Sequence, residues 1–254
     1  MVFILLVFFM FVPTLSSAEE ITLYDLQGDW LNKEYYETLA ATKSPRKAVQ
    51  GIEYTNFAIV PDQENHRWLQ IFNFHEGLWF TITGLQPNIE PDIYRILFHD
   101  KQEAGHATQN DRFYVQPGKP VNTIEWLFAT NYGKTAEEHR VTFIHAEPDL
   151  QRLVNRTVLA GIYSDQNGRL FVFGENGVAQ WPDTTFTYKV GLDYIFAECD
   201  YFYFLDEQNG NIGTEWYAFE WQGNKLYIYT THFSKEVSEL IERDEKPLYV
   251  LNPK

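Results

Sequence analysis

Short runs rich in aromatic and β-branched residues alternate with polar turn segments along most of the chain. This pattern is typical of β-strands, whose side chains point alternately to opposite faces. In "NTIEWLF", for example, Ile124, Trp126 and Phe128 share one face, which we expect to line a core. The candidate strands of the first half are "GIEYTNFAIV", "RWLQIFNF", "LWFTITGL", "DIYRILF", "RFYVQ", "NTIEWLF" and "HRVTFIHA".

A second strand series follows "AEPDLQRLVNRT", which reads as a linker or one short helix. In "KLYIYTTHF" the Tyr side chains share one face and Leu226 and Ile228 share the other, so we expect both faces to be covered. The strands of this series are "VLAGIYSD", "GRLFVFGE", "GVAQWPD", "TTFTYKVGL", "YIFAECDYFYFLD", "TEWYAFEW" and "KLYIYTTHF". Hairpin turns are expected at Asn167-Gly168, Asn176-Gly177, Asn209-Gly210 and Gly223-Asn224.

Two short segments carry a helical pattern. "NKEYYETLAATKSP" places Tyr36, Leu39 and Ala40 on one side, which predicts a helix from about Lys33 to Ala41. In "FSKEVSELIERDE" the apolar residues Val237, Leu240 and Ile241 recur at helical spacing, which predicts a C-terminal helix. The sequence therefore predicts an all-β protein built as an antiparallel meander, with one short helix near each end.

The two strand series begin alike, with Leu-x-Gly-x-aromatic at residues 26–30 and again at 159–163. A Gly two residues before a large ring lets the backbone pass close to another part of the chain while the ring plugs the end of a core. We therefore expect Gly28 and Trp30 to be structural residues at one end of a core, and Gly161 and Tyr163 at the end of another. The repeat predicts two related β units that meet near residue 150.

Gly28-Asp29-Trp30 resembles the G-x-W motif that opens the first strand of lipocalins and other calycin barrels. "LAGIYSDQNGRLFVFGENG" is similar to the small antiparallel units of bacterial lipocalin-like domains. The resemblance implies a divergent exported bacterial member with a calycin-like β-barrel, and with the first helix as a lid over a barrel end or portal. One enlarged barrel remains an alternative to two linked barrel-like halves, which would span residues 19–148 and 149–254.

Residues 1–18, "MVFILLVFFMFVPTLSSA", form an uncharged apolar run that ends in small residues. This is the pattern of a signal peptide, and the mature chain is expected to start near Glu19. An uncleaved membrane anchor is the alternative. We expect a secreted or periplasmic protein with no stable membrane insertion after the signal is cleaved.

The net charge limits the partners that we expect, and the cysteine content limits the disulfides that the chain can form. Thirty-five acidic and twenty basic side chains give a net charge of −15. Such an acidic protein repels phosphate backbones, so no nucleic-acid partner is expected. Cys199 is the only cysteine, which excludes an intramolecular disulfide framework, and its apolar surroundings predict a buried thiol.

No motif predicts catalysis, a metal or a cofactor. The seven histidines are scattered, and neither H-E-x-x-H nor G-x-S-x-G occurs. Asp193, Glu198, Asp200 and Asp206 lie in an aromatic-rich region, and paired carboxylates beside aromatic rings are what glycoside hydrolases use. Positions at strand ends and turns favour a structural role for these carboxylates.

Two functions follow from these features. The first is a non-enzymatic exported protein that binds a small apolar or amphipathic molecule among inward-facing rings. The second is an extracellular carbohydrate-active hydrolase that uses paired carboxylates on a β scaffold. The candidate ligand-binding residues are Tyr188, Tyr217, Phe219, Tyr227 and Tyr229.

Overall fold

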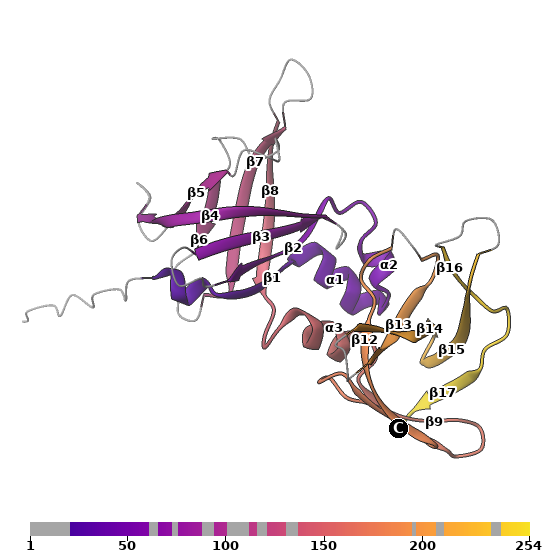
Figure 1. The fold of residues 1–254 in the computed structure, drawn as a ribbon. Helices are drawn as coiled ribbons and strands as arrows, with labels where there is room; N and C mark the ends of the chain where they lie inside the picture. Colours follow the sequence, from indigo (N-terminus) through magenta and orange to yellow (C-terminus); the bar gives the residue numbers. More distant parts are fainter. Residues whose placement is uncertain are drawn as a thin grey trace, which may run out of the picture.

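The chain forms an all-β antiparallel fold with few helices, as the sequence predicts, in a computed structural model. Its strands belong to two assemblies, with the helices α1, α2 and α3 between them (Figure 1). The predicted signal segment 1–18 lies outside the described residues. The structure describes residues 21–60, 66–72, 76–87, 94–100, 112–115, 121–130, 137–194, 197–206, 211–234 and 240–254.

The first assembly is a closed eight-stranded barrel in which consecutive strands pair antiparallel. Strand β1 pairs with β2 on one side and with β8 on the other, which closes the ring. Every strand predicted in this half is present. The barrel strands are β1 Gly28–Asn32, β2 Tyr54–Val60, β3 His66–Phe72, β4 Glu76–Pro87, β5 Tyr94–Asp100, β6 Arg112–Val115, β7 Thr123–Thr130 and β8 Glu137–His145.

The second assembly, here called the curled sheet, contains β9 to β17. Its strands pair in sequence from β9 to β15, and β17 then pairs with both β15 and β9, so the sheet curls back toward its first strand. The predicted turns at Asn167-Gly168 and Asn176-Gly177 lie between paired strands. The strands are β9 Gly161–Ser164, β10 Leu170–Phe173, β11 Val178–Trp181, β12 Thr184–Val190, β13 Asp200–Asp206, β14 Asn211–Gln222, β15 Lys225–Phe233, β16 Ile241–Arg243 and β17 Tyr249–Pro253.

Polar side chains define where two helices begin. Asn32 accepts hydrogen bonds from the backbone N–H groups of Glu34 and Tyr35, at 2.8 and 3.2 Å, and Asp149 accepts one from Arg152 at 2.8 Å. The predicted first helix is therefore present, and the ambiguous linker is a helix. No helix of the described segments has the length and apolar content to cross a membrane. The helices are η1 Leu23–Leu26, α1 Lys33–Thr42, α2 Pro45–Ala48 and α3 Leu150–Val158.

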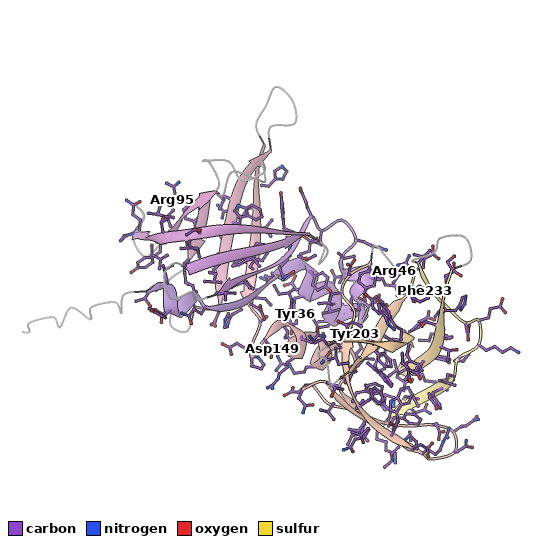
Figure 2. All side chains as sticks on the ribbon, viewed as in Figure 1. Tyr36, Arg46, Arg95, Asp149, Tyr203 and Phe233 are labelled. Carbon is purple, nitrogen blue, oxygen red and sulfur yellow. The ribbon has the colours of Figure 1, made fainter. Side chains whose placement is uncertain are left out.

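Helix α1 packs between the barrel and the curled sheet. Its buried residues Tyr35 and Leu39 belong to one apolar core together with Leu153 of α3 and Phe219 of β14. Tyr36 packs against the same core and lies between the two assemblies in Figure 2. The helix expected to act as a lid thus contributes side chains to a core shared by both halves.

The predicted C-terminal helix is wrong where the structure describes it. Ile241–Arg243 is strand β16, which pairs antiparallel with the end of β15, Phe233 facing Ile241. Residues 235–239, with Val237, lie outside the described residues. The apolar spacing of this short segment fits a helix as well as a strand, and pairing with the long strand β15 determines the outcome. The sequence reading also missed β17.

Candidate functional site

Trp30 belongs to the barrel's described core and is 0% exposed. Its indole Nε1–H donates to the carbonyl of Leu26 at 2.9 Å, so this buried donor is satisfied. The indole ring stacks against Phe57, with centroids 6.0 Å apart, and lies 4.9 Å from the ring of His145. Both rings come from the strands that pair with β1 at Trp30.

Gly28 allows the chain to pass close to His145. Its φ is +120°, and a Cβ at this position would lie 2.6 Å from Nε2 of His145. That same nitrogen lies 3.0 Å from the carbonyl oxygen of Gln27, and Nδ1 lies 3.1 Å from the carboxylate of Glu147. The first Gly of the repeated motif is therefore required by both backbone conformation and space.

The second copy of the motif repeats the first in its hydrogen bonding. The Tyr163 hydroxyl donates to the carbonyl of Leu159 at 2.6 Å, as Trp30 donates to Leu26. In each copy the ring reaches back four residues to the Leu of its own motif. A Cβ on Gly161 would lie 3.0 Å from the Tyr163 hydroxyl oxygen, so the second Gly also makes room for its aromatic partner.

Helix α3 covers one end of the curled sheet. The Trp221 indole N–H donates to the Val158 carbonyl at 3.1 Å, and the Gln151 amide donates to the Val190 carbonyl at 3.3 Å. The side chain of Asn155 also donates to the carbonyl of Glu175, in the turn between β10 and β11, at 3.3 Å. Polar contacts from α3 therefore reach three strand ends or turns, all at the same end of the sheet.

Five aromatic side chains gather at the opposite end of the curled sheet, and we call them the Trp181 cluster. They come from the end of β11, from β12, β13 and β14, and from the start of β17, and all are partly buried. The Trp181 ring meets the others edge-on, at centroid distances from 5.1 to 6.3 Å, while the Phe186 and Phe204 rings stack at 3.7 Å. The members are Trp181, Phe186, Phe204, Tyr217 and Tyr249.

The Trp181 cluster packs on two fully buried rings. The ring centroids of Phe171 and Phe202 lie 5.7 and 6.4 Å from that of Trp181. The Trp181 Nε1 atom is buried and has no hydrogen-bond partner among the described residues. The indoles of Trp30 and Trp221 both have carbonyl acceptors. A buried N–H without an acceptor is uncommon in proteins and is destabilising.

The structure brings only one of the five predicted ligand-binding residues into this cluster, namely Tyr217. Tyr188 and Phe219 are buried deeper in the same core, and the Tyr188 hydroxyl donates to the Gly174 carbonyl at 3.0 Å. Tyr227 and Tyr229 lie on the other face of the sheet, in a separate core with Tyr201 and Ile241. Both faces are covered here, as the strand pattern predicts.

The candidate carboxylates do not all come together. Asp200 accepts hydrogen bonds from the backbone N–H of Arg46 in α2 at 2.9 Å and from the Tyr194 hydroxyl at 3.2 Å. Burial raises the pKa of Asp200, and these hydrogen bonds oppose that shift. Asp200 and Glu198 line a cavity of about 220 Å³ between α2 and the curled sheet. The described contacts of Asp200 connect α2 to β13.

Cys199 lies beside this cavity and is buried, as predicted from its apolar surroundings. Burial raises the pKa of its thiol to about 11. The thiol is therefore protonated near neutral pH, which makes it a poor nucleophile. Among the described residues, no three His, Cys, Asp or Glu side chains converge in a way that could hold a metal ion.

Sequence reasoning missed four members of the Trp181 cluster. Trp181 precedes a Pro in the tight turn between β11 and β12, and Phe186 and Phe204 lie on the face of their strands opposite Thr187 and Tyr203. Strand alternation could have grouped these positions. Tyr249 could not be assigned to this face from the sequence, because the strand that contains it, β17, was not predicted.

Comparison of the chain with protein-family models, with curated proteins and with solved structures finds no match. The closed eight-stranded antiparallel barrel is compatible with the calycin-like architecture that Gly28-Asp29-Trp30 implies.

Proposed function

We propose that this protein is a non-enzymatic binding protein for a small apolar or amphipathic molecule, which binds at the Trp181 cluster. The observation that carries the proposal is the buried Trp181 indole N–H, which has no acceptor among the described residues and lies among partly exposed rings. The cluster lies at the end of the curled sheet that α3 does not cover. Pockets for small molecules are typically lined by apolar and aromatic side chains with a few polar groups.

The chemistry of the cluster indicates what the ligand needs. An unpaired buried donor costs about 1–3 kcal/mol, and a ligand with an acceptor oxygen would remove that cost. Partly exposed rings gain further from apolar contact, at roughly 25 cal/mol for each Å² removed from water. The best-matched ligand has a flat apolar or aromatic body that carries a carbonyl, ether or hydroxyl oxygen.

Two further considerations support binding over catalysis. The G-x-W resemblance and the closed barrel favour a lipocalin-like protein, and the apolar segment 1–18 favours export. Among the candidate catalytic carboxylates, Asp200 is hydrogen-bonded to α2 and to Tyr194, an arrangement that suits a structural contact. Glu198 and Glu220 line the same cavity, but the Glu220 carboxylate is paired with Arg243 at 2.6 Å, whereas a glycosidase needs an acid and a second carboxylate free to act on the substrate.

The experiment is a fluorescence titration with prodan, a neutral naphthyl ketone whose emission shifts to the blue in apolar surroundings. We expect saturable binding to the wild-type protein. Trp181→Phe keeps a ring but removes the N–H, and it should weaken binding roughly fivefold. Trp221→Phe makes the same change at the end covered by α3 and should leave the affinity unchanged.

Each outcome bears on the proposal. Blue-shifted, saturable binding that weakens in Trp181→Phe and persists in Trp221→Phe supports it. Absence of binding to wild type would overturn it, and so would equal loss of affinity in the two variants. Circular dichroism of each variant should first show the wild-type β spectrum.

A further inference from the structure

A cavity opens where two neighbouring strands of the curled sheet separate. Strands β14 and β15 pair from Gln222 and Lys225 as far as Tyr217 and Thr230. Beyond Thr230, β15 pairs with β16 instead, while β14 continues beside β13. The gap between the diverging strands holds a cavity of about 250 Å³. We call it the divergence cavity.

Residues from both faces of the curled sheet line the divergence cavity, with Tyr217 on the face of the Trp181 cluster and Trp216 on the face of Tyr229. Trp216, Tyr217 and Phe233 all line it, and Phe233, labelled in Figure 2, is 64% exposed. Tyr217 also belongs to the Trp181 cluster, with its ring 5.2 Å from that of Trp181. One aromatic side chain therefore contacts both places, and a single small molecule could occupy both.

The Thr230 and Thr231 hydroxyl groups line the cavity, and each already donates its hydrogen within the chain. A Thr hydroxyl has one hydrogen and two lone pairs. Thr231 donates that hydrogen to the Trp216 carbonyl at 2.8 Å, and Thr230 donates its hydrogen to the carboxylate of Asp244. Each hydroxyl therefore retains only lone pairs for a ligand, so a ligand in this cavity has to bring donors.

The charged side chains at and around the cavity are mostly carboxylates, and Arg243, which faces Thr231 in the strand register, is paired with Glu220 at 2.6 Å. Glu215 lines it, and its carboxylate accepts a hydrogen bond from the Tyr217 hydroxyl at 3.4 Å. His232 also lines it, but its Nδ1 lies 3.1 Å from Asp244 and its Nε2 lies 3.5 Å from Glu242. None of the residues that line the described cavity is Lys or Arg. The electrostatic preference is therefore for a cation.

We propose that the divergence cavity binds a protonated amine, so that the ligand is a cationic amphipathic molecule. Its apolar body packs on the Trp181 cluster, and its ammonium group lies between the Tyr217 ring and the Glu215 carboxylate, which share one face of β14. Ring faces attract cations, and an ammonium supplies the donors that the Thr lone pairs and the carboxylate can accept. This inference rests on the proposed binding function and specifies the class of ligand.

The experiment uses three probes that share a methoxynaphthyl ring, whose ether oxygen can accept from the Trp181 N–H, and that differ in head group: methoxynaphthylethylamine, methoxynaphthylethanol and methoxynaphthylacetate. Each is titrated into the full-length mature protein near neutral pH and at low salt, and binding is measured by calorimetry. We expect the amine to bind roughly tenfold more tightly than the alcohol, and the acetate to bind weakest. Glu215→Gln should bring the affinity of the amine down to that of the alcohol and leave the alcohol unchanged.

Glu198→Gln is the matched control, because Glu198 is an exposed carboxylate on the other cavity. It should leave the affinities of all three probes as they are in wild type. Equal binding of amine and alcohol, or an amine affinity unaffected by Glu215→Gln, would overturn the cationic assignment while prodan binding still upheld the proposed function. Failure of prodan and all three probes to bind would overturn both.

Discussion

Trp30 and Trp181 lie in the interiors of the two strand assemblies, yet their indole N–H groups have different surroundings. The Trp30 ring is fully buried and its N–H reaches the Leu26 carbonyl at 2.9 Å. The Trp181 ring is partly exposed, and its N–H lacks an acceptor among the described residues. The Trp30 N–H is satisfied within the chain, whereas the Trp181 N–H would gain an acceptor from the ligand that we propose.

The two ends of the curled sheet differ in the same way, in whether their buried donors have acceptors. At the α3 end, Tyr163 and Trp221 donate to the carbonyls of Leu159 and Val158. At the far end, the rings of the Trp181 cluster contact one another but leave a buried donor unpaired. The donors are satisfied within the chain at the α3 end, whereas the far end, where we propose that a ligand binds, has a donor without an acceptor among the described residues.

The largest expected effect is that of Trp30→Ala. It removes a fully buried ring from the barrel core and leaves the Leu26 carbonyl without its donor. We expect a loss of about 3–5 kcal/mol in the free energy of unfolding, measured by chemical denaturation. An unchanged midpoint would contradict the structural role assigned to Trp30.

Gly28→Ala should rank second. The new Cβ would meet Nε2 of His145 at 2.6 Å, and the φ of +120° is unfavourable for any residue with a side chain. We expect a loss of roughly 2–3 kcal/mol in the free energy of unfolding. Gly84→Ala is the matched control, because no described atom lies within 4 Å of its Cβ position, and it should change stability little.

The paired variants Trp30→Phe and Trp181→Phe test the comparison directly. Each loses an indole N–H, but only Trp30 loses a hydrogen bond with it. We expect Trp30→Phe to cost about 2 kcal/mol more in unfolding free energy than Trp181→Phe in the absence of ligand. Equal costs by thermal or chemical unfolding would contradict the claim that the Trp181 donor is unpaired.

Tyr163→Phe should have a smaller effect that tests the repeated motif. It removes the hydroxyl that donates to the Leu159 carbonyl at 2.6 Å, which should cost about 1 kcal/mol of unfolding free energy. Tyr227→Phe removes a hydroxyl from a partly buried ring on the other face of the sheet and should cost less. Equal effects of the two changes would mean that the second motif copy does not depend on its hydrogen bond.

The smallest effect concerns pH and the contact between α2 and the curled sheet. Burial raises the pKa of Asp200 in the folded protein, so its stabilising contribution is complete below the unfolded-state pKa and is lost as pH rises through the folded value. The Asn side chain in Asp200→Asn does not ionise, so the variant does not lose stability in this way as pH rises. The variant should therefore gain stability relative to wild type as pH rises through the acidic range, and parallel stability curves would contradict this assignment.

Local pattern was sufficient to predict the strands other than β16 and β17, because alternation and turn residues are properties of short segments. Helix α1 was also predicted, since Asn32 and the apolar spacing after it lie close together in sequence. The segment around Ile241 failed, because its structure depends on pairing with Phe233 across a connection that local spacing does not encode. Strand β17 was missed for a similar reason, as it completes the sheet by pairing with distant strands.

The candidate site could be predicted only in part. Alternation placed Tyr227 and Tyr229 on one face of β15, but both faces of the curled sheet are covered, so alternation could not tell which face is inside. The Trp181 cluster combines rings from five strands. No single segment shows that Trp181 lacks an acceptor, because this follows from the arrangement of all its neighbours.

The most direct test of the central claim is an NMR titration that follows the indole N–H signals as prodan is added. The sequence contains seven Trp residues, and the Trp30, Trp181 and Trp221 signals can be assigned with the corresponding Trp→Phe variants. We predict that the Trp181 signal moves downfield as its N–H gains an acceptor, while the signals of Trp30 and Trp221 stay in place. A saturated complex in which the Trp181 signal has not moved would contradict the account.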